Sequence, residues 1–417
     1  MTVAAGLRGS LEGRELSDSL ASRLGAGAAL LVAVLPVAMA LANRSAPLLL
    51  AFAALLALAS VAARTGWAGV GGAFAPLARS SLALGAAAFI GLAIASYGWS
   101  ADRAQTLRAL GEGAVPLLAG AVVLRLLPGL APRWAARALA AGVIAAALIC
   151  IGELEFDMPL RSALHLRAKA FEYNRPVLTL LVLFWPLCAV AMASRRSPVI
   201  WLALAATTAA IWCSQSGTAM FAQALSLIAA LVAWRFPRAM LAGGAMAVAI
   251  VFAFIFAFGE IARSVLPDAT YDALAWAHAA DRVEIWRSYG AVMLAHPWLG
   301  VGFGTSATLG DTAIAGEVAS EFRRMLAVGH PHNGYLQIGV ELGMVGCLLA
   351  LAIALRLLWN WRNLCGPHIW SRVGLFAMAA ATMLVGHGAW QAWWIAVVFA
   401  GAAVTRTIVG HDVETKG

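Results

Sequence analysis

Charged residues are scarce in this sequence. Only 12% of the 417 residues are Asp, Glu, Lys or Arg, about half of the charged fraction of a soluble globular domain. Hydrophobic residues make up 62%, and the mean hydropathy is +0.84. Between Leu24 and Arg406 no polar stretch is long enough to build a second core, which argues against a string of soluble domains. The composition therefore predicts one membrane domain.

The few charges also argue against other classes of protein. The formal net charge is +9, but the Arg residues lie in short clusters between apolar runs, as in membrane proteins whose positive loops set the topology. No nucleic-acid-binding motif accompanies them, so membrane lipids are expected as partners and nucleic acid is not. The spacing of the five cysteines is typical neither of metal ligands nor of a disulfide framework, so we expect them to be small core residues. No Asp-x-Asp pair or His/Asp cluster suggests a metal site, and no cofactor is expected.

The bilayer core, about 30 Å thick, needs about 20 residues of helix, and by this measure the sequence has about twelve apolar spans, of which the fourth is short. They lie near 24–42, 46–63, 82–99, 113–127, 136–153, 177–193, 198–213, 218–234, 239–258, 333–355, 372–386 and 389–405. Arg clusters occupy alternate connections, which places these connections and both termini in the cytoplasm. The expected fold is an all-α integral membrane protein with a cytoplasmic segment 1–23, helices one to nine over 24–258, a loop 259–332, helices ten to twelve over 333–405, and a cytoplasmic tail 406–417.

The loop 259–332 is the one large piece expected outside the membrane. Connections of this length are usually functional or disordered. The run Asp281–Trp286 can form an amphipathic helix, so the loop is expected to be folded and partly interfacial. Shorter outer segments are expected at 43–45, 99–111, 155–176 and 214–217.

The most informative stretch runs from His330 to Gly346, where this loop enters the tenth apolar segment as His-Pro-His-Asn-Gly-Tyr-Leu-Gln-Ile-Gly-Val-Glu-Leu-Gly-Met-Val-Gly. Asn333 is a good N-cap, so His332 would lie at the positive end of the helix dipole. That position favours a neutral imidazole that can accept a proton. The stretch also holds three glycines expected to share one face and to let a neighbouring helix approach: Gly339, Gly343 and Gly346.

This stretch resembles the signature of the O-antigen ligase and polymerase family, a family of lipid-linked glycan transferases. The resemblance rests on the His-Asn pair, the aromatic-Leu-Gln and the Glu-x-Gly-x-x-Gly that follows. A second stretch of this sequence also resembles the family. It reads Arg282-Val-Glu-Ile-Trp286, followed by His296-Pro-Trp-Leu-Gly-Val-Gly-Phe-Gly304. The segment Trp99–Arg103 looks family-like as well. The resemblance implies a fold like that of C-class membrane glycosyltransferases, with the long loop typical of the ligase branch.

One segment departs from the family pattern. Family members often carry a basic residue in a Ser-x-Ser-basic corner, whereas this sequence has Gly217 after Ser214-Gln215-Ser216. Arg175 matches another basic position common in the family and is a candidate for the second positive charge.

The resemblance implies that a glycan leaves an undecaprenyl diphosphate carrier, with Arg282 and Arg175 binding the diphosphate and His332 serving as the base. Inversion at the anomeric carbon without a metal is expected. Further substrate-binding candidates are Asn333, Tyr335, Gln337, Glu341 and His330. Simpler alternatives remain: an interfacial or capping role for His332, an ion pair of Arg282 with Asp281 or Glu284, and a structural role for Glu341.

Three functions fit these residues. The expected one is an O-antigen ligase that moves the glycan to lipid A core on the periplasmic face of the bacterial inner membrane. A polymerase of O-antigen or exopolysaccharide repeat units would use the same residues with a glycan acceptor. A transporter of lipid-linked sugars is the third, although the sequence suggests neither an internal repeat nor a helix that breaks within the membrane.

Overall fold

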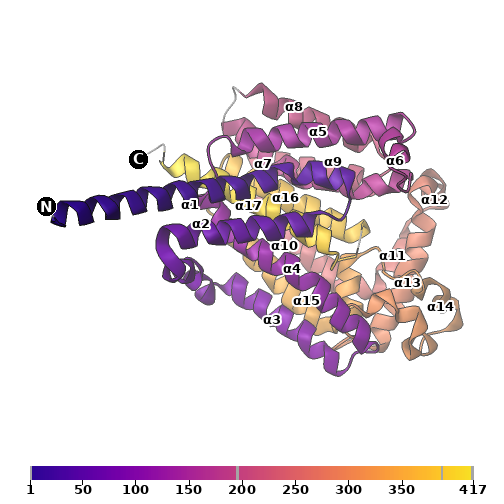
Figure 1. Ribbon diagram of the computed structural model, residues 1–417. Helices are drawn as coiled ribbons and strands as arrows, with labels where there is room; N and C mark the ends of the chain where they lie inside the picture. Colours follow the sequence, from indigo (N-terminus) through magenta and orange to yellow (C-terminus); the bar gives the residue numbers. More distant parts are fainter. Residues whose placement is uncertain (1, 194–196, 387, 415–417) are drawn as a thin grey trace. The chain divides into compact units, whose positions relative to one another are not determined.

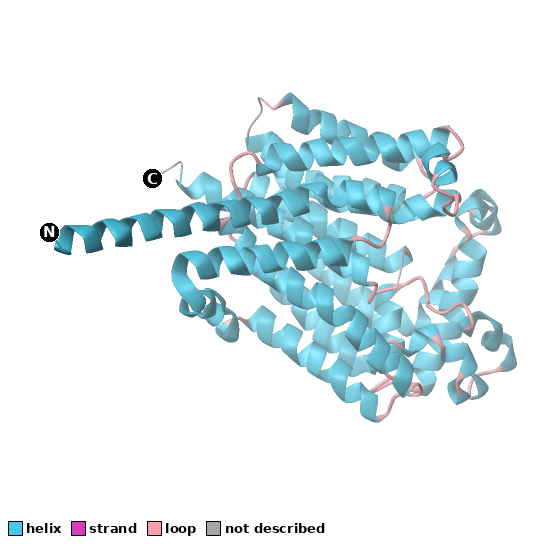
Figure 2. Ribbon diagram, viewed as in Figure 1, coloured by secondary structure: helices cyan, strands magenta, loops and turns pink. Residues whose placement is uncertain are grey.

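The computed structural model describes residues 2–193, 197–386 and 388–414. Over these residues the chain is built from helices joined by short loops, with no strand (Figure 2). Ten described helices are long and apolar enough to cross a membrane: Ser17–Leu41, Ala46–Arg79, Ser81–Gly98, Arg103–Gly129, Ala135–Glu155, Ala170–Ala193, Gly217–Arg235, Pro237–Val265, Gly334–Asn360 and Pro367–Val385. The two other predicted segments correspond to the shorter apolar helices Pro198–Cys213 and Ala392–Thr407. The predicted all-helical, multi-pass membrane fold is confirmed.

The chain divides into two compact units. The first comprises Met1–Ala78, Val115–Gln215 and Ala392–Gly417. Its main helices are α1 (Thr2–Leu41), α2 (Ala46–Phe74), α5 (Ala135–Glu155), α7 (Asn174–Ala193), α8 (Pro198–Cys213) and α17 (Ala392–Glu414) (Figure 1). Helix α7 packs against α1, α5, α8 and α17, and its residues 176–189 are all buried. This helix is therefore the centre of the first unit.

The second unit comprises Arg79–Ala114 and Ser216–Gln391. Its main helices are α3 (Ser81–Ala95), the first turns of α4 (Arg103–Leu126), α9 (Gly217–Arg235), α10 (Pro237–Phe254), α11 (Phe258–Val265), α13 (Ala279–Ala295), α15 (Gly334–Asn360) and α16 (Pro367–Val385). Helix α15 packs against α3, α10, α13 and α16. The segments 96–106, 281–304 and 330–346 all belong to this unit, so one folded body holds the family-like blocks.

Shorter elements complete the chain. They are the helices α6 (Pro159–Ala163), α12 (Asp268–Ala273) and α14 (Ser320–Leu326), and the 3-10 turns η1 (Ala75–Arg79), η2 (Ser96–Gly98), η3 (Leu127–Gly129), η4 (Ala170–Tyr173), η5 (Ile255–Ala257), η6 (Ala275–Ala277), η7 (Thr305–Ala307), η8 (Leu309–Asp311) and η9 (Ala313–Gly316). Several helices begin with proline at their first position, where its missing N–H costs nothing: α8, α10 and α16. The long segment before α15 contains α12, α13 and α14, so it is folded, as predicted.

Two predicted boundaries were wrong. The fourth segment was expected at 113–127, but α4 begins at Arg103, because Asp102 caps its first turn by accepting from the Gln105 amide at 3.0 Å. The long loop was expected from Gly259, but α11 continues the apolar helix to Val265. Residues 2–23 are helical and continuous with the first span.

Candidate functional site

Helix α15 is interrupted at Gly343. This glycine has φ +62° and ψ −162°, a backbone conformation that L residues rarely adopt. A Cβ atom at Gly343 would collide with the carbonyl group of Trp298, so the close neighbour is a loop backbone. The prediction that Gly343 shares a continuous helix face with Gly339 and Gly346 was therefore wrong, although a close approach does occur.

The loop after α13 supplies hydrogen-bond partners for the backbone groups that this break leaves without helical partners. Four hydrogen bonds join them: Met344 N to Pro297 O at 2.7 Å, Val345 N to Trp298 O at 3.2 Å, Val301 N to Val340 O at 2.9 Å, and Gly302 N to Glu341 O at 2.9 Å. In an unbroken helix the amides of Met344 and Val345 would donate to the carbonyls of Val340 and Glu341. Loop atoms replace each of these partners, so the break leaves none of the four groups unpaired. The two family-like blocks thus form one hydrogen-bonded unit.

The Glu341 side chain adds a second connection between the same blocks. It is fully buried and accepts from four donors: Gly304 N at 2.6 Å, Trp390 Nε1 at 2.6 Å, Gln337 Nε2 at 2.9 Å and Ser306 N at 3.4 Å. A buried carboxylate is costly unless its oxygens are hydrogen-bonded, and here both oxygens are used. The contacts give Glu341 a structural role in holding the turn at Gly304, and substrate binding by Glu341 stays a prediction.

The segment after α3 is hydrogen-bonded to the same turn. Five hydrogen bonds hold it: Trp99 Nε1 to Leu299 O at 3.1 Å, Ala101 N to Val301 O at 2.9 Å, Phe303 N to Ser96 Oγ at 2.9 Å, Thr106 Oγ1 to Phe303 O at 2.7 Å, and Thr308 Oγ1 to Asp102 Oδ2 at 2.8 Å. The Gln105 amide and the Thr308 hydroxyl both lower the pKa of the Asp102 carboxyl. A third family-like segment thus belongs to the assembly.

Helix α15 starts as the sequence predicts. The Asn333 side chain accepts from the Leu336 amide at 3.0 Å, which confirms the N-cap. His332, one residue earlier, has φ +50°, in the left-handed region that His tolerates better than most side chains. Such a backbone costs on the order of 1 kcal/mol and is often found at functional sites. The rings of His332 and His330 lie 4.1 Å apart, so the two imidazoles form a pair in front of the helix.

Helix α13 carries Arg282. The side chain is partly buried, and desolvation lowers the pKa of its guanidinium, which still remains protonated at neutral pH. The nearby carboxylates are engaged elsewhere, since Asp281 lies 3.4 Å from His278 and Glu284 pairs with two other arginines. The alternative that Arg282 pairs with Asp281 or Glu284 was therefore wrong. In the part of the chain that the structure describes, no carboxylate neutralises this guanidinium.

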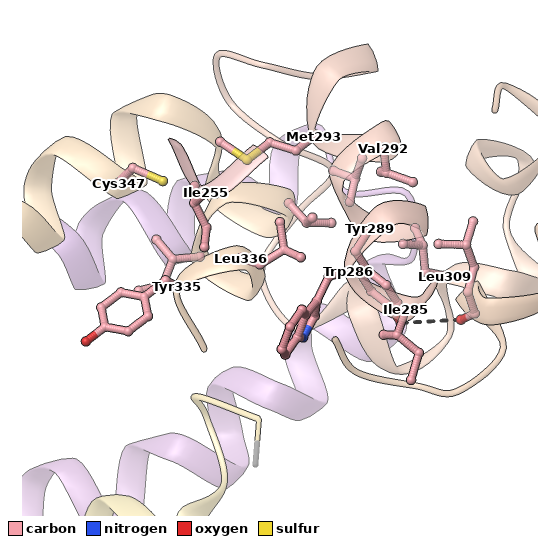
Figure 3. Packing of buried hydrophobic residues seen from close by; sticks show 14 of the residues in the cluster. Ile255, Ile285, Trp286, Tyr289, Val292, Met293, Leu309, Tyr335, Leu336 and Cys347 are labelled. Atoms are coloured by element: carbon pink, nitrogen blue, oxygen red, sulfur yellow. Dashed lines mark hydrogen bonds between the residues drawn. The ribbon is translucent and has the colours of Figure 1, made fainter. Parts of the chain in front are cut away.

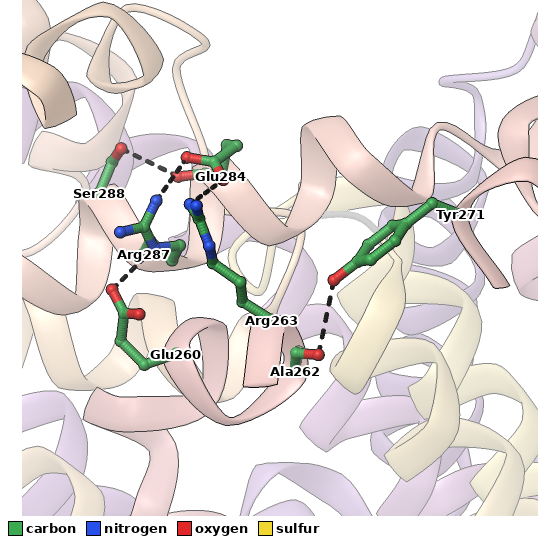
Figure 4. A network of polar contacts seen from close by, with 7 residues as sticks. All are labelled: Glu260, Ala262, Arg263, Tyr271, Glu284, Arg287 and Ser288. Atoms are coloured by element: carbon green, nitrogen blue, oxygen red, sulfur yellow. Dashed lines mark hydrogen bonds and ion pairs between the residues drawn. The ribbon is translucent and has the colours of Figure 1, made fainter. Parts of the chain in front are cut away.

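An ion-pair network fixes the N-terminal half of α13 (Figure 4). Arg287 lies 2.7 Å from Glu260 and 2.9 Å from Glu284, while Arg263 lies 3.2 Å from Glu284. The hydrogen bond that Arg287 donates to Glu260 raises the pKa of Arg287. Glu260 and Arg263 belong to α11, so the network joins α11 to α13 and holds the helix that bears Arg282.

The other face of α13 packs into a buried core with α15 (Figure 3). Met293 contacts Gly339, where a side chain would collide with its sulfur atom. The Tyr289 hydroxyl lies 3.2 Å from the Ser306 carbonyl and 3.4 Å from the Leu326 carbonyl. Burial raises the pKa of Tyr289, which therefore stays a neutral donor. Apolar packing and this hydroxyl hold α13, η7 and α15 together.

A cavity of about 220 Å³ opens beside the histidine pair. Its described lining residues are Gln105, Ala109, Glu112, Gly304, Ala307, Gly329, His330, Gln337, Gly388, Trp390 and Gln391. Two of the predicted substrate-binding residues, His330 and Gln337, lie here together. Gln105, Glu112 and Trp390 were not predicted to belong to the site. No motif surrounds them in the sequence, and they lie far along the chain from His330 and Gln337.

The other predicted site residues lie elsewhere. Tyr335 points into the apolar core, with its ring edge against Phe252 and its hydroxyl donating to the Ala380 carbonyl at 3.2 Å. Arg175 belongs to the first unit, where its guanidinium lies 5.7 Å from the Trp393 ring centroid. Substrate binding by these two residues stays a prediction. At the corner after α8, Ser216 caps α9 by accepting from Ala219 N, with Gly217 in the first turn.

Comparison with known proteins bears on residues 181–351, which match the model of a family described as O-antigen ligase. The matched segment contains α13, the turn at Gly304 and the first half of α15. Through this segment the chain is similar to the O-antigen ligase family. The matched segment thus includes two of the three hydrogen-bonded segments described above, 281–304 and 330–346, but not 96–106.

Three rickettsial proteins, each described as a candidate polysaccharide ligase, are similar to part of the chain. The Rickettsia prowazekii protein is 31% identical over 127 residues, which cover 28% of this chain and 29% of that protein. The Rickettsia conorii protein is 28% identical over 138 residues, 32% of this chain and 33% of that protein. The Rickettsia bellii protein is 27% identical over 163 residues, 37% of this chain and 39% of that protein. The similarity thus spans roughly a third of each relative.

Proposed function

We propose that this chain is a glycosyltransferase that moves a glycan from an undecaprenyl diphosphate carrier to an acceptor hydroxyl. The observation that carries the proposal is the assembly of three separate segments around the head of α15, with the imidazole pair His330 and His332 beside a cavity. The segment that matches the O-antigen ligase family supplies α13, the turn at Gly304 and the start of α15 to this assembly. Relatives described as candidate polysaccharide ligases support a glycan as the substrate.

In the proposed reaction, the acceptor hydroxyl oxygen attacks the anomeric carbon of the sugar that is bound to the diphosphate. The new carbon–oxygen bond forms as the bond to the phosphate oxygen breaks, and the bonding electrons leave with undecaprenyl diphosphate. His332 accepts the proton of the acceptor hydroxyl. A single displacement of this kind inverts the anomeric carbon. It needs no metal if arginines stabilise the leaving diphosphate.

Arg282 is the first candidate for that stabilisation. Its guanidinium is partly buried and has no carboxylate partner among the described residues, whereas most buried charges in proteins are paired. A diphosphate would supply the missing negative charge, and the planar guanidinium can bind two of its oxygens at once. The ion pairs of Arg287 keep α13, and with it Arg282, in a fixed position.

Arg175 is the second candidate, proposed from the family resemblance. Its guanidinium lies over the Trp393 ring, 5.7 Å from the ring centroid. We expect Arg175→Lys to raise the KM for the lipid-linked donor, because an ammonium group cannot bind two oxygens in the same plane. An unchanged donor KM in purified Arg175→Lys protein would remove this assignment.

For the acceptor we propose lipid A core, with the site on the periplasmic face of the bacterial inner membrane. The single long outer segment between α10 and α15 is more typical of ligases than of polymerases, which supports a ligase. A repeat-unit polymerase is the nearest alternative and would use a second carrier-linked glycan as acceptor. A transporter of lipid-linked sugars is less consistent with an imidazole pair beside a cavity at a helix end.

Product analysis distinguishes these functions. Detergent-purified protein is incubated with undecaprenyl diphosphate glycan, with and without lipid A core, and the products are resolved by gel and mass spectrometry. The proposal predicts glycan on lipid A core. A ladder of longer carrier-linked glycans would instead identify a polymerase, and no product with active control enzymes would favour transport.

A further inference from the structure

The cavity beside His330 has the size of a site for one small ring. Its volume of about 220 Å³ is below the roughly 300 to 1,000 Å³ of pockets that enclose drug-sized ligands. Three glycines reduce the bulk of its walls: Gly304, Gly329 and Gly388. A Cβ atom at Gly388 would lie 3.2 Å from Gln337 Oε1 and 3.6 Å from the His330 ring, so a side chain there would enter the space between them.

The lining chemistry suits a neutral ligand rich in hydroxyl groups. The one carboxylate among the described lining residues belongs to Glu112, which pairs with Arg108 at 2.8 Å, and no described lining residue is an arginine or a lysine that could bind a phosphate. The amides of Gln105, Gln337 and Gln391 can each donate and accept hydrogen bonds. Because a sugar hydroxyl also donates and accepts, amides and carboxylates are suitable partners for it. The described lining therefore fits a sugar ring better than a diphosphate.

Part of the wall is fixed in advance by Glu341. This carboxylate accepts from Gln337 Nε2 at 2.9 Å and from Trp390 Nε1 at 2.6 Å, and both donors belong to lining residues. Gln337 Oε1 also accepts from the Ala389 amide at 2.7 Å. Rigid walls lower the entropy lost when a ligand binds.

Gln105 supplies hydrogen-bonding groups that the fold does not use. Its side chain is partly buried, and it has no hydrogen-bond partner among the described residues. On a partly buried lining residue, such an amide is available to a ligand in the cavity.

We propose that this cavity is a subsite for one sugar ring of the glycan substrate, with Gln105 as a specificity-determining residue. The inference rests on the proposed function, since it assigns the glycan that the enzyme would transfer or receive. Donor and acceptor both carry sugars, so either could place a ring here, and the two sources are separated by varying them independently.

Two variants test the subsite. Ala307→Leu adds bulk to an exposed wall position, and Gln105→Leu keeps a similar volume but removes the amide. Ala313→Leu is the matched control, because Ala313 is also an exposed alanine in a 3-10 turn of the same segment but does not line the cavity. Steady-state transfer is measured with donor varied at fixed acceptor, and then the reverse. We expect each lining variant to raise the KM of one substrate about tenfold, which corresponds to roughly 1.4 kcal/mol of binding, while kcat changes little.

A binding measurement separates the subsite from the proposed reaction. Saturation-transfer NMR detects contact between the protein in nanodiscs and either of two lipid-free probes, the glycan repeat unit or the core oligosaccharide. We expect wild-type and Ala313→Leu protein to transfer saturation to one probe and Ala307→Leu to lose most of it, even if wild-type protein proves inactive in transfer. Equal signals from wild-type and Ala307→Leu protein, or unchanged KM values for both substrates in an active enzyme, would overturn the subsite.

Discussion

The amide of Met344 donates to the carbonyl oxygen of Pro297 at 2.7 Å. The two residues are 47 positions apart in the sequence, yet this hydrogen bond replaces one that α15 would otherwise make within itself. The loop is therefore a part of the broken helix, and the position of the turn at Gly304 depends on the break at Gly343.

Gly343→Ala should be strongly destabilising. The new Cβ atom would meet the Trp298 backbone at a positive φ, and neither cause of strain can be relieved by a side-chain rotation. We expect a loss of about 2 kcal/mol or more, seen as a lower thermal midpoint in detergent. The matched control is Gly91→Ala in α3, where a methyl group has open space. An unchanged midpoint in Gly343→Ala would show that the break is not required.

Glu341→Gln should destabilise the same assembly without changing its volume. The carboxylate accepts from four N–H groups, and an amide has one oxygen and places its own N–H₂ against two of those donors. Leaving buried donors unpaired costs about 1 to 3 kcal/mol. Thermal unfolding of purified protein measures this loss. Glu112→Gln, at an exposed carboxylate, should leave the midpoint near that of the wild type.

Arg282→Lys should impair transfer while leaving the protein folded. Lysine keeps the charge but cannot bind two phosphate oxygens in one plane, so we expect a rise in donor KM of about tenfold, equivalent to roughly 1.4 kcal/mol. Arg324→Lys in α14, an exposed position, is the matched control. A wild-type donor KM in Arg282→Lys would be evidence that this arginine does not hold the diphosphate.

Local patterns predicted the parts of this fold that depend on a single helix. Apolar runs located all twelve helical segments, and Asn333 was recognised as an N-cap because its role involves only the next three residues. The break at Gly343 was not predicted, because a glycine inside an apolar run is equally typical of a site where a neighbouring helix packs closely. Its partners lie in another segment, and nothing in the spacing of either segment reveals the pairing.

The candidate site was predictable only as separate motifs. His330 and Gln337 were selected from one motif, and the structure places them in the same cavity. Gln105 and Trp390 come from distant segments, and their place beside these residues depends on tertiary packing. Tyr335 is the opposite case: it belongs to the motif and was expected to bind substrate, but its ring packs into the core.

His332 is proposed to accept the proton of the acceptor hydroxyl, and the transfer activity of His332→Ala is the sharpest test of this role. His278→Ala is the matched control, because His278 has φ +54°, close to the +50° of His332, but is exposed beside Asp281. Purified variants with equal thermal midpoints are compared for glycan transfer from undecaprenyl diphosphate. The account predicts that His278→Ala retains wild-type activity and that His332→Ala loses at least about a hundredfold, the lower end of the contribution of general-base catalysis. Wild-type transfer by His332→Ala would contradict the proposed mechanism.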